Sequence, residues 1–383
     1  MTRPFDFAVV GAGMAGASTA AHLAEHARVC LLEMEAQPGH HSTGRSAALF
    51  SEAYGNSLIR GLTRASRDFL FDPPADFTDT VLVAPRPVLT TFTDNDERDA
   101  VAELHPPGGF EVLTPVRARE LCPVLRTDGV AGAVLNGGSA DIDVDALHQG
   151  YLRLLRRRGG ELRLDARVNG LERIGEAWRL QTHAGPVEAG VVVNAAGAWA
   201  EELAALAGTA PRGLTPLRRS ACLVFPPEGA DVAAWPLLKD AGESYYLKPD
   251  AGMLLVSPCD ETPVNAGDAQ PEELDIAVAI DRLERATTLS VRRVTHRWAG
   301  LRTFAPDRSP VIGYDSAVSG FFWVAGLGGY GIQTAPALSR FAAAAALGRP
   351  ADPRLAEFGV NPAGMAPDRP ALTSARRRES APA

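Results

Sequence analysis

Cysteine is scarce in this chain, and the spacing of the cysteines excludes two kinds of site. The four cysteines, Cys30, Cys122, Cys222 and Cys259, lie far apart and form no CxxC pair. They therefore give no zinc pattern, and Cys30 falls inside an apolar stretch that favours a buried thiol. We expect free cysteines in a reducing compartment rather than a disulfide framework.

Long apolar runs and excess positive charge are also missing. No run of about twenty apolar residues is present that could span a bilayer. The first thirty residues already form a strand–turn–helix–strand pattern, so we expect no signal peptide. The formal net charge of −8 argues against a nucleic-acid surface. These absences predict a cytoplasmic protein and leave peripheral membrane association open.

Metal-ligand patterns are absent as well. Four histidines show no metal spacing and are interpreted as surface or loop residues: His40, His41, His148 and His296. We therefore predict no bound metal.

A glycine turn near the start is the most informative feature that is present. Residues 7–10 form an apolar strand, the sequence GAGMAG follows at 11–16, and a second apolar strand ends on Glu33. This order of strand, turn, helix, strand and acid is the dinucleotide-binding fingerprint. Gly11 permits the turn, Gly13 lets the backbone approach a pyrophosphate at the helix N-terminus, and Gly16 lets the helix pack on the strand. Glu33 is placed to hydrogen-bond a ribose hydroxyl.

Strand–glycine–helix units recur later in the chain, with strand-rich sequence between them. Apolar strands at 191–193 and 321–325 each run into glycine-containing turns, and helices are expected at 14–26 and 332–347. An antiparallel meander is expected from 162 to 182. Residues 218–257 show further strands around a turn at 249–252, followed by a helix at 272–288.

This distribution predicts an α/β protein with a discontinuous dinucleotide domain. We expect a Rossmann-like FAD-binding domain of the glutathione-reductase type from residues 1–77, 140–212 and 297–360. An inserted α+β substrate domain on an antiparallel sheet is expected from 78–139 and 213–296. Residues 361–383 are rich in Pro, Ala and Arg without periodicity and are predicted to be a mobile tail.

Several stretches resemble one family of flavoproteins. They are HSTGRSAA at 41–48, DID at 141–143, VNAAGAW at 193–199, YLKPDAG at 246–252, WAGLR at 298–302, PDRSPVIG at 306–313 and GGYGIQT at 328–334. Through these motifs the chain, up to about residue 347, resembles the D-amino-acid oxidase and glycine/sarcosine oxidase superfamily. Within that superfamily it is most similar to the bacterial D-arginine dehydrogenases.

The resemblance implies FAD as the cofactor. It is expected to be non-covalent, because no cysteine follows Arg302 where monomeric sarcosine oxidases attach their flavin. The implied FAD-binding residues are Gly11, Gly13, Met14, Ala15, Gly16, Glu33, Met34, Thr43, Gly44, Arg45, Ser46, Ala47, Val168, Ala196, Gly197, Trp199, Arg302, Gly328, Gly329, Tyr330, Gly331, Ile332 and Gln333.

The resemblance also implies how an amino acid substrate is held. Arg219 and Arg302 would grip its carboxylate, because arginine binds carboxylates bidentately. The hydroxyls of Tyr54 and Tyr246 would assist, and the Gly329 carbonyl would accept from the substrate amine. Arg219 as a solvated strand end and Tyr54 as a packing residue remain alternatives.

Two departures from the D-arginine dehydrogenase pattern bear on the substrate. Val88 replaces the acid that faces the substrate guanidinium, and Leu49 replaces an active-site histidine. We therefore expect a pocket for D-amino acids with neutral or apolar side chains. A secondary-amine oxidase, a 2-hydroxy-acid dehydrogenase and a non-catalytic flavin-binding redox partner remain alternatives. The electron acceptor, whether oxygen, a quinone or another molecule, is left open.

Overall fold

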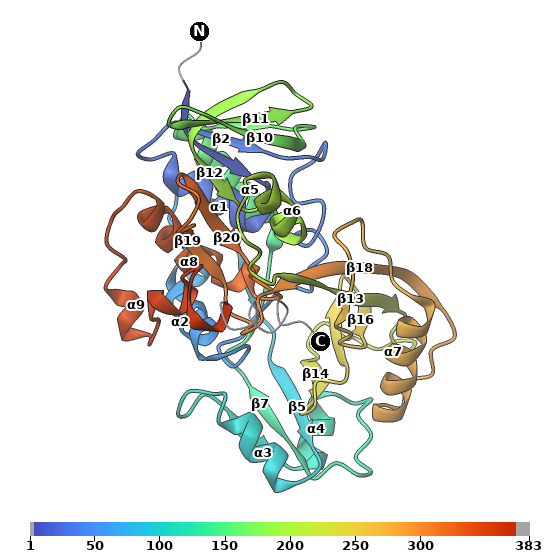
Figure 1. The fold of residues 1–383 in the computed structure, drawn as a ribbon. Coiled ribbons are helices and arrows are strands. Elements are labelled where there is room, and N and C mark those ends of the chain that lie inside the picture. Colours follow the sequence, from blue (N-terminus) through green and yellow to red (C-terminus); the bar gives the residue numbers. More distant parts are fainter. Residues whose placement is uncertain (1–3, 373–383) are drawn as a thin grey trace, which may run out of the picture.

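The computed structural model describes residues 4–372 and contains two large β-sheets, each with its own helices. Figure 1 shows the first sheet and its helices in one half of the molecule and the second sheet in the other, with the long strands β13 (Thr215–Val224) and β18 (Val294–Phe304) running out from the junction. A small third sheet joins β3 (Leu49–Phe50), β8 (Ala140–Ile142) and β4 (Val83–Pro85). The predicted α/β fold is confirmed.

The first sheet is built on the glycine-turn strand. β1 (Phe5–Val10) pairs in parallel with β2 and β12, and β12 pairs in parallel with β20. Such strands are covered on both faces, which explains their continuous apolar sequences. The remaining strands are β2 (Val29–Leu32), β9 (Glu161–Arg163), β10 (Val168–Ile174), β11 (Ala177–Thr182), β12 (Val187–Asn194), β19 (Val311–Tyr314) and β20 (Phe321–Ala325).

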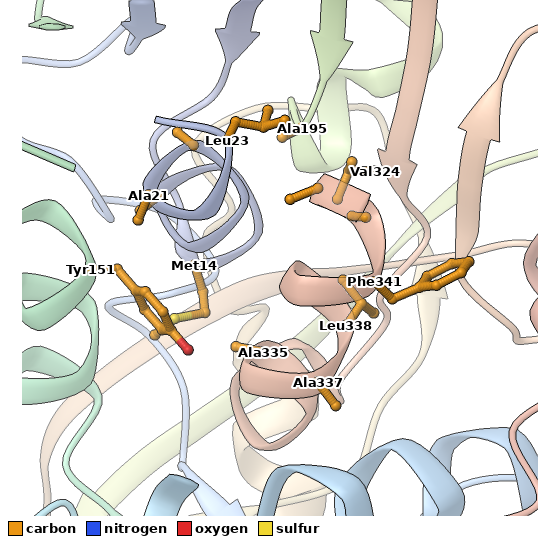
Figure 2. Packing of buried hydrophobic residues seen from close by; sticks show 14 of the residues in the cluster. Met14, Ala21, Leu23, Tyr151, Ala195, Val324, Ala335, Ala337, Leu338 and Phe341 are labelled. Atoms are coloured by element: carbon orange, nitrogen blue, oxygen red, sulfur yellow. The ribbon is translucent and has the colours of Figure 1, made fainter. Parts of the chain in front are cut away.

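Four helices pack together on one face of this sheet. α1 (Met14–Leu23) contacts both α5 (Val144–Arg157) and α8 (Gly331–Ala346), and α8 also contacts α2 (Ser57–Phe71). The small residues of α1 and α8 allow their backbones to approach closely, and Figure 2 shows part of the resulting core. The opposite face carries α6 (Ala200–Leu206), preceded by the turn η1 (Gly197–Trp199). No described helix combines the length and the hydropathy of a membrane span.

The second sheet has nine strands and is antiparallel except where β5 (Val88–Phe92) meets β14 (Leu237–Asp240). Its other strands are β6 (Glu111–Leu113), β7 (Gly132–Asn136), β13, β15 (Tyr246–Asp250), β16 (Met253–Ser257), β17 (Thr262–Pro263) and β18. Its helices are α3 (Asn95–Ala102), α4 (Pro115–Leu121) and α7 (Glu273–Ala286).

Three expectations about the elements differ from the structure. The first helix ends at Leu23, three residues early. Leu162 does not begin the meander, because β9 returns beside β2 and pairs with it in parallel. The predicted boundary at residue 297 falls inside β18, a strand of the second sheet. All strands of the first sheet lie within the segments predicted for the cofactor domain, and the domain division itself stays a prediction.

The predicted mobile tail also needs correction over residues 361–372. After α9 (Arg354–Glu357), the chain forms a 3₁₀ turn at Pro362–Met365, where Met365 is fully buried. Arg369 then donates two hydrogen bonds of 2.7 Å to the carboxylate of Asp307. This segment is therefore anchored by a buried arginine. The remainder of the predicted tail, residues 373–383, lies outside the described residues.

Candidate active site

A cavity of about 470 Å³ extends between the two sheets, from the glycine turn to the paired arginines. It is lined by most of the predicted FAD-binding residues: Gly11, Gly13, Met14, Ala15, Glu33, Met34, Thr43, Arg45, Ser46, Ala47, Val168, Ala196, Gly197, Trp199, Arg302, Gly328, Gly329, Gly331 and Ile332. Four others are not among the lining residues: Gly16, Gly44, Tyr330 and Gln333. Residues that are far apart in the sequence thus converge on one site.

The glycine turn leaves space where a pyrophosphate would lie. Gly11 has a φ of +101°, and a Cβ there would lie 2.4 Å from the carbonyl oxygen of Ala195. At Gly16 a Cβ would lie 1.8 Å from the oxygen of Gly11. At Gly13, by contrast, a Cβ would meet only Thr43 Oγ1, at 3.2 Å. Gly11 and Gly16 therefore permit the tight packing of the turn, while Gly13 borders open space at the N-terminus of α1.

Glu33 closes the end of β2 and faces the cavity. Its carboxylate accepts hydrogen bonds from the backbone N–H groups of Ala12, at 2.8 Å, and Glu35, at 3.1 Å. The side chain is buried, and burial raises its pKa although the two N–H donors act against that shift. These bonds fix the carboxylate while leaving oxygen lone pairs to accept from ribose hydroxyls.

The loop after β2 is held against both parts of the molecule. The backbone N–H of Met14 donates to Thr43 Oγ1 at 2.9 Å, and Ser42 Oγ donates to the carbonyl of Leu301 at 2.6 Å. Arg45 donates to the Ala299 carbonyl at 3.0 Å. The loop is therefore fixed between α1 and β18, where it forms one wall of the cavity.

His148 was predicted to be a surface or loop histidine, and that prediction is wrong. It lies on α5, is 2% exposed, and its Nε2 donates to the Ala12 carbonyl at 2.8 Å. Burial lowers its pKa, so the ring is neutral at neutral pH. The sequence did contain a signal for this role, because His148 lies on the apolar face of a helix capped by Asp143. Its side chain supports the glycine turn through the carbonyl of Ala12.

His40 and His41 lie close to a third potential metal ligand, Glu35. Nitrogen atoms of His40 and His41 and a carboxylate oxygen of Glu35 all lie within 4.8 Å of one another. The sequence spacing did not indicate this group. A hydrogen bond of 2.9 Å between His41 Nε2 and Glu35 Oε1 accounts for part of the arrangement without an ion.

The arginine end of the cavity is built on one face of the second sheet. In the antiparallel pair of β13 and β18, Arg219 lies opposite Gly300, and Arg302 follows two residues later. Because side chains alternate along a strand, Arg219, Gly300 and Arg302 share one face. Trp298 and Ala221 line the cavity from the same face. The alternation of WAGLR was sufficient to predict Trp298 and Gly300 at this site, and both were missed.

Arg302 presents its charge to the cavity. Its Nη1 donates to the Tyr54 hydroxyl at 3.1 Å, and among residues 4–372 no carboxylate forms an ion pair with it. A Cβ at Gly329 would lie 2.9 Å from the guanidinium carbon, so a larger residue there would displace the arginine head group. Burial raises the pKa of the nearby Tyr246, whose hydroxyl therefore stays protonated. An anion entering here meets one available guanidinium and the lining residue Tyr246, while Tyr54, which is not among the lining residues, holds the guanidinium by its hydrogen bond.

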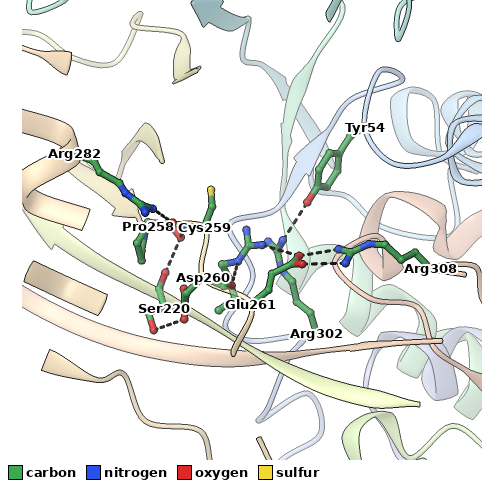
Figure 3. Close-up of polar contacts among 11 residues, drawn as sticks. Tyr54, Ser220, Pro258, Cys259, Asp260, Glu261, Arg282, Arg302 and Arg308 are labelled. Atoms are coloured by element: carbon green, nitrogen blue, oxygen red, sulfur yellow. Dashed lines mark hydrogen bonds and ion pairs between the residues drawn. The ribbon is translucent and has the colours of Figure 1, made fainter. Parts of the chain in front are cut away.

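Arg219 is held differently from Arg302. Its Nε donates to the Asp260 carbonyl at 2.8 Å, and its Nη2 donates to Glu261 Oε1 at 3.1 Å. Glu261 thus contacts both Arg219 and Arg308, and Figure 3 shows it beside Arg308, with Arg302 and Tyr54 nearby. The neighbouring residue Arg218 is paired with Asp275, at 2.9 Å. Arg219 and Arg302 therefore lie on the same face of the second sheet, but only Arg219 is paired with a carboxylate.

The remaining predicted residues lie around this site rather than in its lining. Leu49 is in β3, and Val88 is a buried residue of β5 between Leu237 and Asn136. Tyr330 contacts Tyr54 edge-to-face, with ring centroids 5.0 Å apart. Gln333 accepts from the N–H of Ser51 at 3.1 Å and donates to Thr63 at 2.9 Å. The substrate-pocket assignment of Leu49 and Val88 stays a prediction.

The chain belongs to the DAO family of FAD dependent oxidoreductases, whose sequence model matches residues 6–345. Over 94% of its length it is 26% identical to the uncharacterized oxidoreductase YurR of Bacillus subtilis, and it covers 98% of that protein. It is 27% identical to 4-methylaminobutanoate oxidase (formaldehyde-forming) of Paenarthrobacter nicotinovorans, over 87% of this chain and 42% of that protein.

Solved structures agree on the fold. Glycine oxidase from Geobacillus kaustophilus superimposes with a TM-score of 0.79 at 21% identity, covering 94% of this chain and 99% of that one. Iminodiacetate oxidase from Chelativorans gives a TM-score of 0.77 at 21% identity, with 92% and 98% covered. A particular closeness to D-arginine dehydrogenase stays a prediction.

The cofactor is FAD, and the cavity fits it. The glycine turn offers backbone to a pyrophosphate, Glu33 offers oxygen acceptors to a ribose, and Gly328 and Gly329 line the cavity beside Arg302. When bound, FAD supplies a two-electron acceptor, and the surrounding residues supply binding and orientation.

Proposed function

We propose that this oxidoreductase oxidises the Cα–N bond of a small amino acid. The observation that carries the proposal is Arg302, a cavity-facing guanidinium with Tyr54 as its hydrogen-bond partner. Burying a charge without a counter-ion costs several kcal/mol, so an unpaired guanidinium in a cavity indicates that a ligand supplies the counter-ion. A substrate carboxylate is the matching group, because it accepts two parallel N–H bonds from arginine.

The residues around Arg302 have distinct roles in this proposal. Arg302, Tyr54 and Tyr246 bind the carboxylate, and Arg219 contributes a further donor from the adjacent strand. The Gly329 carbonyl accepts a hydrogen bond from the substrate amine and orients its nitrogen. The substrate amine would give up its proton to solvent, bound FAD would supply the acceptor for the hydride from Cα, and water would hydrolyse the resulting imino acid to a 2-oxo acid and ammonia.

We further propose D-amino acids with neutral or apolar side chains as the preferred substrates. The D preference rests on the resemblance to D-arginine dehydrogenases, and the side-chain preference rests on Val88 and Leu49. A cationic side chain would find no acid at either position and would lose its hydration without compensation.

Secondary amines are a second candidate class. Related proteins include 4-methylaminobutanoate oxidase, iminodiacetate oxidase and the mitochondrial dimethylglycine dehydrogenase of Mus musculus. The match to the last of these has 28% identity and covers 60% of this chain and 28% of that protein. Each of these names describes a carboxylate joined to an alkylated amine, which the same arginine would hold.

The proposal is tested by anaerobic reduction of the FAD-loaded protein. D-leucine, D-arginine, L-leucine, sarcosine and D-lactate are each mixed with it, and the loss of visible flavin absorption is followed. We expect the fastest reduction with D-leucine and release of ammonia. Faster reduction by sarcosine would favour the secondary-amine candidate, whereas reduction by D-lactate alone would contradict oxidation of a C–N bond.

A further inference from the structure

Glu261 joins Arg219, which lines the substrate end of the cavity, to Arg308; Glu261 and Arg308 are not themselves among the lining residues. Glu261 lies in the short segment between β16 and β17, and its two carboxylate oxygens accept from Arg308 Nη1 and Nη2 at 2.9 and 2.7 Å. One of these oxygens, Oε1, also accepts from Arg219 Nη2 at 3.1 Å. Figure 3 shows the carboxylate facing the guanidinium group of Arg308. A single protein carboxylate therefore satisfies two of the three arginines gathered here.

Glu261 is ionised in this setting. Burial acts to raise its pKa, but the hydrogen bonds from Arg308 and the charges of Arg308, Arg219 and Arg302 lower it overall. Arg308 is fixed in turn, since its guanidinium carbon lies 3.8 Å from the centroid of the Phe304 ring. The anion is consequently a permanent part of the site at neutral pH.

Arg219 and Arg302 are spaced as two carboxylate receptors would be. They are diagonal neighbours on one face of the β13–β18 pair, and such neighbours lie about 7–8 Å apart. A short dicarboxylate could reach both guanidinium groups. In this chain, however, Glu261 already occupies the position of a second carboxylate beside Arg219, while Arg302 has no carboxylate partner among the described residues.

We propose that Glu261 is a specificity-determining residue that fills the second carboxylate position and restricts the site to ligands with one carboxylate. This inference rests on the proposed function, in which Arg302 receives the substrate carboxylate. A second carboxylate would approach Glu261 and be repelled, whereas a neutral side chain would not.

A merely structural role for Glu261 makes a different prediction. The Glu261–Arg308 pair links the β16–β17 segment to the loop after β18, so its loss could lower stability. A structural role would not change the ratio between ligands with one and two carboxylates. That ratio is therefore the decisive readout.

The experiment compares acetate with malonate as non-oxidisable probes. Their dissociation constants are measured from the flavin spectrum of the FAD-loaded protein at about pH 8, where all their carboxyl groups are ionised. The wild type is expected to bind acetate at least about tenfold more tightly than malonate. Glu261→Gln keeps the side-chain shape but removes the charge, and it should reduce that preference at least about tenfold.

Glu188→Gln is the matched control. Glu188 accepts two hydrogen bonds from Arg179, at 3.1 and 2.7 Å, on the β11–β12 pair of the other sheet. It should leave the acetate-to-malonate ratio unchanged.

Three outcomes would count against the inference. Equal binding of malonate and acetate by the wild type would overturn the role of Glu261, even if the Glu261→Gln protein failed to fold. An unchanged ratio in a folded Glu261→Gln protein would overturn it as well. Both results leave the proposed function standing if D-leucine reduces the flavin. A wild type that binds neither probe contradicts the carboxylate site itself, and with it both proposals.

Discussion

At the scale of single residues, the site depends on side chains that are absent as much as on those present. Arg302 has its position because Gly329 carries no Cβ, which would lie 2.9 Å from the guanidinium carbon. Gly300 likewise lets Arg45 lie close to the sheet face beside Arg219, since a Cβ there would be 3.5 Å from the Cβ of Arg45. Both glycines fall within motifs that were recognisable in the sequence, because backbone must approach a ligand at such positions.

Gly13→Val should weaken FAD binding. The branched side chain would enter the space at the N-terminus of α1, where the Cβ alone already lies 3.2 Å from Thr43 Oγ1. Overpacking costs about 1–3 kcal/mol, which corresponds to about a fivefold to 150-fold loss of affinity. The measurement is flavin absorbance per protein after purification.

The control for that variant is Gly137→Val. Gly137 lies in the loop between β7 and β8, and a Cβ there would meet no atom within 4 Å. It should retain normal flavin content. Full flavin content in Gly13→Val would show that the pyrophosphate does not approach this turn.

Other residue-level features had no local sequence signal. Glu261 acquires its role through Arg219 and Arg308, both of which are distant in the chain. Leu49 and Val88 were assigned from resemblance, and they lie outside the lining of the cavity. A local sequence pattern identifies the glycines whose backbone approaches a ligand. It does not identify which charged side chains, distant in the sequence, will form ion pairs.

At the scale of secondary-structure elements, the long pair β13–β18 sets the geometry of the substrate end. Its register places Arg219 and Arg302 on one face, which strand alternation alone predicts once the pairing is known. The pairing itself was not readable, because it joins residues about eighty positions apart. Strands with their own turns, such as β15 and β16 around 249–252, were predicted well because their contacts are local.

Arg369→Met should destabilise the protein through its C-terminal segment. The side chain is 6% exposed, donates twice to Asp307, and also donates to the carbonyls of Pro310 and Ser309 at 3.0 and 2.9 Å. Loss of hydrogen bonds to a charged group costs about 2–3 kcal/mol in the free energy of unfolding. Urea denaturation measures this change.

Arg349→Met serves as its control, because Arg349 is exposed. It should alter the free energy of unfolding by less than about 0.5 kcal/mol. Equal stabilities for the two variants would mean that the segment at 361–372 contributes nothing to the fold.

His22 on α1 should make the stability of the protein depend on pH. Burial and the charges of Arg158 and Arg340 lower its pKa from 6.5 to about 3. Because the folded-state pKa lies below the unfolded one, the contribution of His22 is fully present above about pH 6.5 and is lost as the pH falls towards 3. Between pH 7 and pH 5 this loss amounts to about 2 kcal/mol.

The test compares wild type with His22→Gln in chemical denaturation at both pH values. The variant should lose about 2 kcal/mol less stability on acidification than the wild type. Equal losses in the two proteins would mean that His22 is already protonated in the native state.

At the scale of the whole molecule, the sequence was sufficient to predict the fold class and the cofactor. Strand–glycine–helix units occur in three separate segments, and the structure brings all three into one sheet whose strand ends surround the cavity. The tail at 361–372 was predicted wrongly because Pro- and Ala-rich sequence shows no periodicity, while its anchor is one arginine paired with a distant aspartate. Composition and periodicity indicate where helices and strands form. They do not indicate whether an irregular segment is held to the rest of the protein by a long-range contact.

The measurement that tests the central claim most directly is anaerobic reduction of FAD-loaded Arg302→Met by D-leucine. Removing one partner of a desolvated charge pair costs about 2–5 kcal/mol, so the second-order rate constant of flavin reduction should fall at least about thirtyfold while the flavin stays bound. Arg297→Met, on the exposed part of β18, should behave as the wild type. Near-normal reduction of Arg302→Met would contradict the account, because the substrate carboxylate would then be held elsewhere.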